Sequence, residues 1–598
     1  MTDPSAVPAG LRRTMRIAAG LTVLGCVISF AIRTAVIPSH FGTPTSVWLA
    51  SLLFRTQDGA WLVAGALLLL VLSALRIPAA FSGWDRLHPR PWLTTSVLAG
   101  LTLAATLAGT FLVFGNFHFS RDEFLADFDS VIFRSGRLIA DLPTEWRPFA
   151  RALGPDFMLP IPGNAGWISA YLPVNAAFRA LIGLILDPAF ASPVLACIAV
   201  IALFGIARRL WPGRLDAAFV AVTLLVTSSQ FLVTAMTSYA MTAHLAFNLL
   251  WLWLYLRDDR LSHAGAIGVG FLATGLHQLL FHPLFAAPFI ARLWWIGRRR
   301  PALLYIVAYA AICIFWMLYW QLVLSVHGVA PDDAETTGPA LFIVRAMRFL
   351  RDFSWDGTGL MLKNVLRFIA WQNLIALPLA LAAWTAIRRG EGLARPLIGG
   401  LLLTIAAMFI ILPYQGHGWG YRYLHGLLGS FCLLAGYGWM AVTARASHRE
   451  IAAGRASLAM TSAIAVAIML PLHAFQAGGL VAPYRKAVAA IEGAPVGIVI
   501  VDRSGLLFAG DLVRNDPFLR NQPKMLDLTY LDENRVADIC KRFTVAVFDR
   551  RQAVALGIPQ DDTLPKLDEE ARARLRAYMA GLSCGTDLVI APASAPAS

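Results

Sequence analysis

The amino-acid sequence predicts a polytopic α-helical membrane protein with about 13 transmembrane helices and a small C-terminal α/β soluble domain. Two features of the composition indicate this class. Of the 598 residues, 58% are apolar and 14% are charged, and the mean hydropathy is +0.63. Soluble domains carry about 25% charged residues. A third feature is the recurrence of long apolar runs over residues 1–477, which stops before a more polar segment, residues 478–598.

The apolar runs define the predicted transmembrane helices, because a helix needs about 20 mostly apolar residues to cross a bilayer. The opening segment MTDPSAVPAGLRRTMR lacks a convincing signal-peptide cleavage site, so the first run is predicted to be a retained helix. The predicted spans lie near 17–37, 59–77, 92–115, 191–207, 217–235, 240–256, 263–276, 283–297, 302–325, 365–387, 396–413, 422–444 and 456–476.

Arginine in the short connections predicts the orientation, because cytoplasmic loops collect Lys and Arg. One set of connections is rich in arginine, whereas MTSYA, HQLLFH and YQGHGWG on the opposite side contain no Lys or Arg. The N-terminus is therefore predicted to be cytoplasmic, and an odd number of spans places the C-terminal segment outside. The arginine-rich set contains Arg12, Arg13, Arg16, Arg76, Arg86, Arg90, Arg208, Arg209, Arg214, Arg257, Arg260, Arg298, Arg299, Arg300, Arg388, Arg389, Arg445 and Arg449.

The formal net charge of +14 does not indicate a nucleic-acid partner, because the basic residues are scattered at the ends of apolar runs rather than gathered on one face. Four of the six cysteines fall inside predicted spans, where cysteine behaves as a small hydrophobe. Cys540 and Cys584 lie in the polar C-terminal segment, and they are expected to pair if that segment faces an oxidising compartment.

Two long segments on the predicted outer side interrupt the spans, at 116–190 and 327–364. The second contains ALFIVRAMRFLRDF, which has the pattern of an amphipathic interfacial helix. In the C-terminal segment, the β-branched runs at 496–502 and 543–549 predict strands, and 567–582 has a helical pattern. These elements predict a small α/β domain.

The first outer segment contains the acidic stretch FHFSRDEFLADFDSVIFRSGRL, residues 117–138. Ser120 followed by Asp122 and Glu123 favours a helix over 120–134 through capping and the helix dipole. In such a helix Asp122 and Asp129 lie seven residues apart on one face. Carboxylates at the edge of a low-dielectric site can act as bases or metal ligands. The alternative is that these acids form the solvated face of a loop.

Two further stretches on the same predicted side carry polar residues. In HQLLFHP, His277 and His282 are five residues apart, a weak match to a helical zinc pair; they are either satisfied structural histidines or part of a site. YQGHGWGYRYLHG contains His417, Tyr421 and Arg422 in a glycine-rich turn. The guanidinium of Arg422 can donate two parallel hydrogen bonds to a phosphate. The alternative role of this turn is to anchor the span at the membrane interface through its aromatic residues. All three stretches are expected to meet around one cavity open to lipid and water.

The topology and the acidic stretch resemble the GT-C superfamily of integral membrane glycosyltransferases. RDEFLADFDSVIFRSGRL places Asp122, Glu123, Phe124 and Gly136 in an order similar to the acidic outer loop of the protein O-mannosyltransferase and aminoarabinose transferase branch. The HGWGYRY turn is similar to a late aromatic and arginine motif of such enzymes. The chain departs from the family in having two spans before 92–115 rather than none, and in having Leu125 and Phe128 in the region where a tyrosine often follows the acidic pair.

The resemblance implies a multi-pass protein of the bacterial inner membrane that transfers a sugar from a polyprenyl-phosphate carrier to a lipid, glycan or protein acceptor on the periplasmic side. It implies that Asp122 is the base that deprotonates the acceptor hydroxyl, or orients that hydroxyl, and that Glu123 is a helper or a ligand of a divalent metal ion, Mg or Mn. The expected cationic groups for the phosphate are Arg422, Lys363 and Arg367. The other expected substrate-binding residues are Asp129, His277, His282, His417 and Tyr421.

Two other functions are compatible with many spans. A transporter or lipid flippase would need charges along a path across the bilayer, and charges near the predicted span centres are scarce, Arg33 being one of the few. An enzyme similar to O-antigen ligases would use a large late loop rather than an early acidic one. The early acidic stretch therefore favours the glycosyltransferase prediction.

Overall fold

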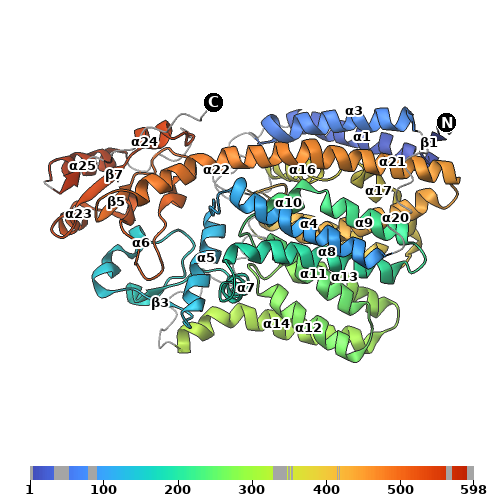
Figure 1. Ribbon diagram of the computed structural model, residues 1–598. Coiled ribbons are helices and arrows are strands. Elements are labelled where there is room, and N and C mark those ends of the chain that lie inside the picture. The colour runs from blue at the N-terminus through green and yellow to red at the C-terminus, as the bar shows by residue number, and fades with distance from the viewer. Residues whose placement is uncertain are drawn as a thin grey trace.

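Helices dominate the computed structural model, and they form a bundle with a small mixed domain at one end (Figure 1). The N-terminus lies at the opposite end of the bundle from this domain. The structure describes residues 5–31, 53–77, 90–326, 347, 351, 355–413, 415, 418–560, 569–582, 584–586 and 588.

The bundle exposes many large apolar side chains, such as Leu21 on the first helix at 50% and Leu101 at 61%. Exposed apolar side chains suit contact with lipid. The helical backbone suits a bilayer as well, because helices satisfy their own backbone hydrogen bonds. The helices of the bundle are α1 (Ala9–Ala31), α3 (Gly59–Ala74), α4 (Pro91–Leu112), α8 (Ala191–Leu210), α9 (Leu215–Val226), α10 (Ser229–Ala235), α11 (Met241–Tyr255), α12 (Arg260–Thr274), α13 (Phe281–Trp295), α14 (Arg299–Val326), α16 (Trp355–Ala370), α17 (Ala376–Ala382), α18 (Trp384–Arg389), α19 (Ala394–Ile411), α20 (Leu428–Thr443), α21 (His448–Ile464) and α22 (Leu470–Glu492).

The count of about 13 spans is not reproduced. Within the described residues, eight helices are long and apolar enough to cross a membrane, or up to nine if the bent pair α9 and α10 is one span. Each predicted run overlaps at least one helix in the described part of the chain, but α11, α12 and α13 have only 15 residues each. The predicted span 365–387 is divided among α16, α17 and α18. Apolar runs therefore located the helices without showing which of them cross the whole bilayer.

The C-terminal domain follows an unusually long helical stretch. Residues His448–Glu492 form 45 consecutive helical residues, made of α21, a π-helical turn and α22. The predicted domain boundary at 478 falls inside α22, which runs from the bundle directly into the domain (Figure 1). The domain is thus joined to the bundle by a helix rather than by a flexible linker.

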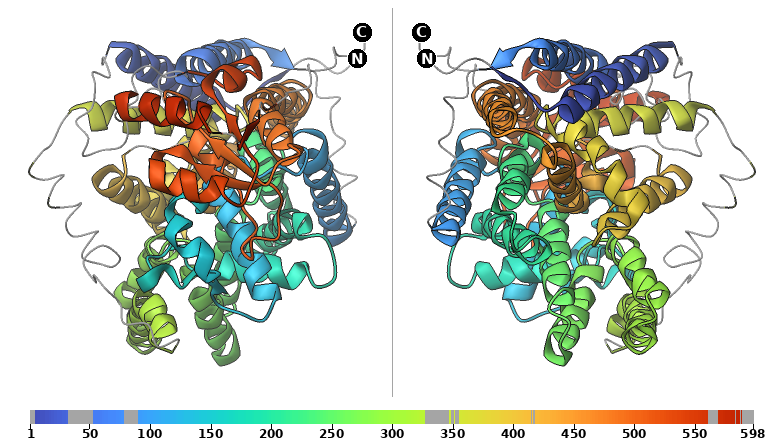
Figure 2. Two further views of the ribbon diagram at one scale, coloured as in Figure 1. Left: turned by 90° about the vertical axis from the view of Figure 1, so that its left-hand side faces the viewer. Right: turned by 90° about the vertical axis from the view of Figure 1, so that its right-hand side faces the viewer.

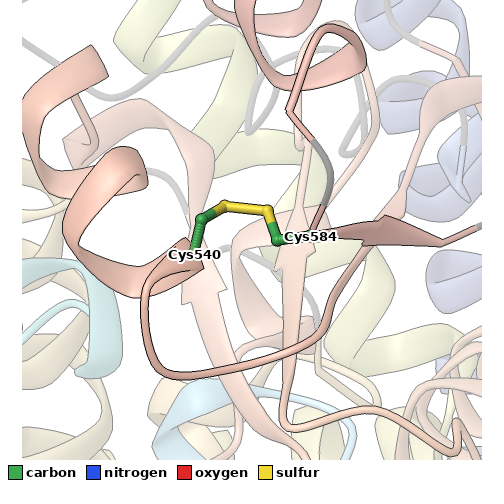
Figure 3. Close-up of a disulfide and its surroundings, with 2 residues drawn as sticks. All are labelled: Cys540 and Cys584. Carbon is green, nitrogen blue, oxygen red and sulfur yellow. A yellow bond between two sulfur atoms is a disulfide. The ribbon is translucent and has the colours of Figure 1, made fainter.

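A four-stranded parallel sheet forms the centre of the C-terminal domain, in the order β6 (Lys524–Asp527), β5 (Ile498–Val501), β7 (Val545–Phe548) and β8 (Gly585–Thr586). Helices α23 (Glu533–Cys540), α24 (Arg550–Ala555) and α25 (Glu569–Ala580) accompany it. The predicted strands and helix are therefore confirmed. Cys540 and Cys584 form a disulfide that ties the end of α23 to the start of β8 (Figure 3).

The first outer segment packs against this domain (Figure 2, left). It contains α5 (Arg121–Arg134), α6 (Ala150–Leu153), α7 (Val174–Ile182) and the short strands β3 (Ala140–Asp141) and β4 (Gly166–Trp167). Its apolar side chains share one hydrophobic core with the sheet of the C-terminal domain. In the second predicted outer segment, the amphipathic stretch lies almost entirely outside the described residues.

Candidate active site

The acidic stretch forms the predicted helix. α5 begins after Ser120, whose side chain accepts a hydrogen bond from the Glu123 backbone, while Glu123 accepts from the Ser120 backbone in return. This reciprocal capping box satisfies two backbone donors at the helix start. The cap sets the direction in which Asp122, the second residue of the helix, projects.

Asp122 lies between an arginine and a tyrosine from distant parts of the chain. One carboxylate oxygen accepts from Nη1 of Arg422 at 2.5 Å, and the other accepts from the hydroxyl of Tyr171 at 2.5 Å. Asp122 and Arg422 are each 12% exposed. The structure thus joins two of the stretches singled out from the sequence in one ion pair with limited access to water.

The surroundings of Asp122 determine its ionisation. Burial alone would raise its pKa, but Arg422, His277 and Tyr171 outweigh burial and hold the pKa well below the ordinary value for aspartate. Asp122 is therefore a carboxylate at neutral pH. As long as Arg422 stays paired with it, this carboxylate is a weak base, because the same arginine that stabilises the charge lowers the proton affinity.

A glycine turn places Arg422 opposite the acid. Gly420 has a φ of +65°, and a Cβ there would lie 2.6 Å from the side chain of Gln230, so glycine is needed for both the backbone and the close packing. The carbonyls of Gly418 and Gly420 accept from Arg367 at 3.1 Å each. The guanidinium of Arg422 also lies over the ring of Tyr423, at 5.2 Å.

Two of the other three acids of α5, Glu123 and Asp129, are buried and have pKa values near neutral pH. Burial raises the pKa of Glu123 to about 7 against the lowering effect of Ser120. Burial also raises the pKa of Asp129 to about 7, and its oxygens accept from the hydroxyl and the backbone of Ser169. Asp122 and Asp129 thus both face the segment 169–171, as their spacing on one face of the helix predicts.

The two histidines of HQLLFHP have different environments. The ring of His277 stacks on Tyr171 with centroids 4.2 Å apart, and burial lowers the pKa of His277 to about 4, so it is neutral at pH 7. His282 is hydrogen-bonded through its two ring nitrogens to Asn248 at 2.7 Å and to Tyr309 at 2.5 Å. His277 therefore borders the Asp122 site, whereas His282 matches the satisfied structural alternative.

The remaining predicted residues are less closely connected to Asp122. Tyr421 is fully buried, and its hydroxyl points to the sulfur of Met361 at 3.7 Å. Lys363 is buried on α16, one turn before Arg367. Arg367 itself holds the glycine turn rather than facing Asp122. His417 lies outside the described residues.

Sequence reasoning missed three tyrosines near the ion pair. Tyr171 donates to Asp122, while Tyr239 and Tyr423 flank the Arg422 guanidinium at 5.5 and 5.2 Å. Tyr171 lies in the stretch WISAYLP, whose proline and aromatic residues are also typical of a membrane interface. Tyrosine is common at membrane interfaces, so its presence there did not single out a site.

The site combines an ionised carboxylate, an arginine and neutral aromatic groups at the end of the bundle that carries the C-terminal domain. Such a set can accept a proton and bind an anion in one small region. No group of three or more His, Cys, Asp or Glu side chains suited to a metal ion occurs within the described ranges. The oxygens of Asp122 and Glu123 are also engaged in the hydrogen bonds given above.

Comparison with known proteins gives structural matches only. No family model matches the sequence, and no curated protein does either. Similar solved structures include ArnT from Cupriavidus metallidurans bound to undecaprenyl phosphate, with a TM-score of 0.46 and 13% identity over 73% of this chain and 86% of that chain. The apo state of the same ArnT gives a TM-score of 0.44 and 15% identity, over 71% and 84%. At this level of similarity the chemistry has to be inferred from the residues of this chain.

Proposed function

We propose that this protein transfers a glycosyl group from a polyprenyl-phosphate-linked donor to an acceptor hydroxyl on a lipid, glycan or protein. The observation that carries the proposal is the ion pair of Asp122 and Arg422, which lie 300 residues apart in sequence and meet at one end of a membrane bundle. An acceptor needs a base, and a phosphate leaving group needs a cation. The pair supplies both.

Donor binding supplies a reason for the pair to separate. A phosphate oxygen competes with Asp122 for the guanidinium, because arginine binds phosphate and carboxylate with the same fork. Once Arg422 turns to the phosphate, Asp122 loses the partner that contributes most to lowering its pKa, and its basicity rises. The paired state is thus a resting state, and the base is activated only when the donor is present.

The reaction is then a single displacement that inverts the sugar. The acceptor oxygen attacks C1 of the sugar, its proton passes to Asp122, and the bond between C1 and the phosphate oxygen breaks. The electron pair of that bond leaves with polyprenyl phosphate, and Arg422 offsets the added negative charge. Tyr171 keeps its hydrogen bond to Asp122 throughout and fixes the orientation of the carboxylate.

The proposed location is the periplasmic face of the bacterial inner membrane. The arginine-rich connections, the position of the N-terminus at the end of the bundle away from the site, and the Cys540–Cys584 disulfide support this orientation. Disulfides persist in oxidising compartments, of which the periplasm is one. Cysteine labelling of the C-terminal domain in intact cells and in inverted vesicles tests it.

A divalent metal ion, Mg²⁺ or Mn²⁺, was expected from the family resemblance. The described donors do not fit it, because Asp122 is occupied by Arg422 and Tyr171 and Glu123 caps its own helix. No step of the proposed reaction passes through a metal. Transfer measured with and without a chelator tests this point.

The proposed function is tested by the lipid that copurifies and by transfer from it. Mass spectrometry of the lipid extract is expected to show a polyprenyl phosphate or its glycosylated form. Radiolabelled lipid-linked sugars extracted from membranes of the source cell are expected to transfer label with the wild-type protein and not with Asp122→Asn. Transport of intact lipid-linked sugar without transfer would support the flippase alternative instead.

A further inference from the structure

The C-terminal domain reaches the first residue of the helix that carries Asp122. Arg121 precedes Asp122 directly, and Nε of its guanidinium donates to Oδ1 of Asp511 in the C-terminal domain at 2.6 Å. Its Nη1 donates to Asp156 of the first outer segment. Asp511 is 2% exposed, so its charge is shielded from water and its attraction to Arg121 is strong. The two neighbours Arg121 and Asp122 are thus held by partners from different parts of the chain.

An arginine of the C-terminal domain, Arg514, holds the residues before the helix cap. Nη2 of Arg514 donates to the carbonyl of Phe119 at 2.9 Å, and its Nε donates to the carbonyl of Asp511 at 2.6 Å. The guanidinium also lies 4.3 Å from the centre of the Phe117 ring. The stretch 511–514 therefore contacts the chain on both sides of Ser120, the residue that caps α5.

The contact region has little space. A Cβ added at Gly510 would lie 2.9 Å from Nη1 of Arg503 and 3.4 Å from Nη2 of Arg121. A side chain at residue 510 would therefore contact both guanidinium groups, and that of Arg503 would have to shift.

The domain also has a rigid base. It is joined to the bundle through the helix that ends with α22, and the hydroxyl of Tyr484 in that helix donates to the carbonyl of Leu507 at 2.7 Å. The ring of Phe119 packs on Tyr484 at 4.8 Å and on Phe508 at 6.0 Å. The start of α5, α22 and the stretch 507–514 form one packed unit.

We propose that the C-terminal domain positions the catalytic base: through Asp511 and Arg514 it fixes the first turn of α5, and thereby the place of Asp122 relative to Arg422. Asp511, Arg514 and Arg121 are positioning residues that do not contact the reacting atoms. The effect on transfer rests on the proposed function, whereas the fixing of α5 does not.

The test compares full-length Asp511→Asn with a matched control, Asp538→Asn. Asp538 lies in the same domain, is 51% exposed and pairs with Arg542 at 3.2 Å. Three quantities are measured: hydrogen exchange of residues 119–126, the affinity for undecaprenyl phosphate, and kcat of transfer from radiolabelled lipid-linked sugar. Arg121→Lys is measured alongside, because it keeps the positive charge but loses the planar guanidinium that donates to two partners at once.

Asp511→Asn is expected to speed hydrogen exchange at the start of α5 by about tenfold and to lower kcat by about tenfold, as small misplacements of catalytic groups do. The affinity for undecaprenyl phosphate is expected to stay within about twofold, since Arg422 is untouched. Asp511→Glu is expected to restore part of kcat, and Arg121→Lys to give an intermediate loss.

Unchanged hydrogen exchange and kcat in Asp511→Asn and Arg121→Lys would overturn the proposal, as would equal losses in Asp538→Asn. A wild-type protein that transfers no sugar would instead count against the proposed function. In that case hydrogen exchange alone decides whether the domain fixes α5.

Discussion

Asp122 lies on a helix whose first turn is tied to a soluble domain, whereas Arg422 follows a glycine turn that is tied to the interior of the bundle. On the acid side, Arg121 is 22% exposed, and its partners Asp511 and Asp156 are 2% and 39% exposed. On the arginine side, Arg367 holds the turn and is itself 3.7 Å from Asp58, and the exposures are 6% and 1%. Asp58 also accepts from Nε1 of Trp371 at 3.0 Å.

The two supports therefore differ in how much water reaches them. Water and salt screen the partly exposed guanidinium of Arg121 to some extent, whereas both partners of the Arg367–Asp58 pair are buried, so removing one of them leaves an uncompensated charge. The support for Arg422 is predicted to be essential for folding, and the support for Asp122 to affect mainly the geometry of the site. On this comparison, the position of Asp122 depends less on the stability of the fold than the position of Arg422 does.

The largest effect is expected from the pair itself. Asp122→Asn removes the proposed base and is expected to lower kcat about 10³-fold, because general bases contribute about 10²–10⁴-fold. Arg422→Gln removes the cation that binds the leaving phosphate and is expected to cause a comparable loss together with weaker binding of undecaprenyl phosphate. Steady-state transfer and lipid binding measure the two effects.

The control for these variants is Asp141→Asn, in the same outer segment as Asp122. The carboxylate of Asp141 is 83% exposed and pairs with Arg137, four residues earlier. This variant is expected to behave as wild type. An Asp122→Asn protein with near-normal kcat would remove Asp122 from the reaction.

The next largest effect is expected in stability, on the arginine side. Arg367→Met leaves Asp58 without its cation and the carbonyls of Gly418 and Gly420 without their donor, at a cost of about 3–5 kcal/mol. Adding Asp58→Asn removes the unpaired charge and is expected to recover part of the loss. Thermal unfolding in detergent, followed by tryptophan fluorescence, measures both. If the double variant is no more stable than Arg367→Met alone, the pair is not the source of the loss.

Interactions between residues close together in the sequence could be predicted from it, whereas most interactions between distant residues could not. The cap of α5 is local, and Ser120 and Glu123 revealed it. The meeting of Asp122 with Arg422 was expected from topology, because both lie at span ends on one side. Tyr171 belongs to an irregular segment whose path no local pattern predicts, and the supports from Asp58 and Asp511 depend on tertiary contacts across 309 and 390 residues.

A smaller effect, on pH dependence, is expected from Glu123. Its pKa is about 7 in the folded protein and near 4.5 when exposed, so the folded form keeps a proton that the unfolded form loses between these values. Stability contributed by this group is present below about pH 4.5 and falls as the pH rises to 7, by about 3 kcal/mol in total. Glu123→Gln keeps the capping box and removes this decline.

Apparent melting temperatures from pH 5 to pH 8 measure the difference between wild type and Glu123→Gln, which is expected to widen in favour of the variant as the pH rises. If the melting temperatures of the two proteins run parallel from pH 5 to pH 8, Glu123 is ionised over this whole pH range. Asp129 adds a decline of the same sign in both proteins, because its pKa is also raised to about 7.

The smallest effect is expected from Tyr171→Phe, and it distinguishes the resting pair from the activated base. In the free protein Arg422 lowers the pKa of Asp122 more than Tyr171 does. In the donor complex Arg422 faces the phosphate, and Tyr171 is the hydrogen-bond partner that remains on the carboxylate. Loss of that hydrogen bond is therefore expected to reduce kcat by about three- to tenfold and to move the acid limb of kcat to higher pH, while the acid limb of kcat/KM moves much less. Equal movement of both limbs would show that Arg422 stays on Asp122 when the donor binds, and the proposed exchange of partners would then be wrong.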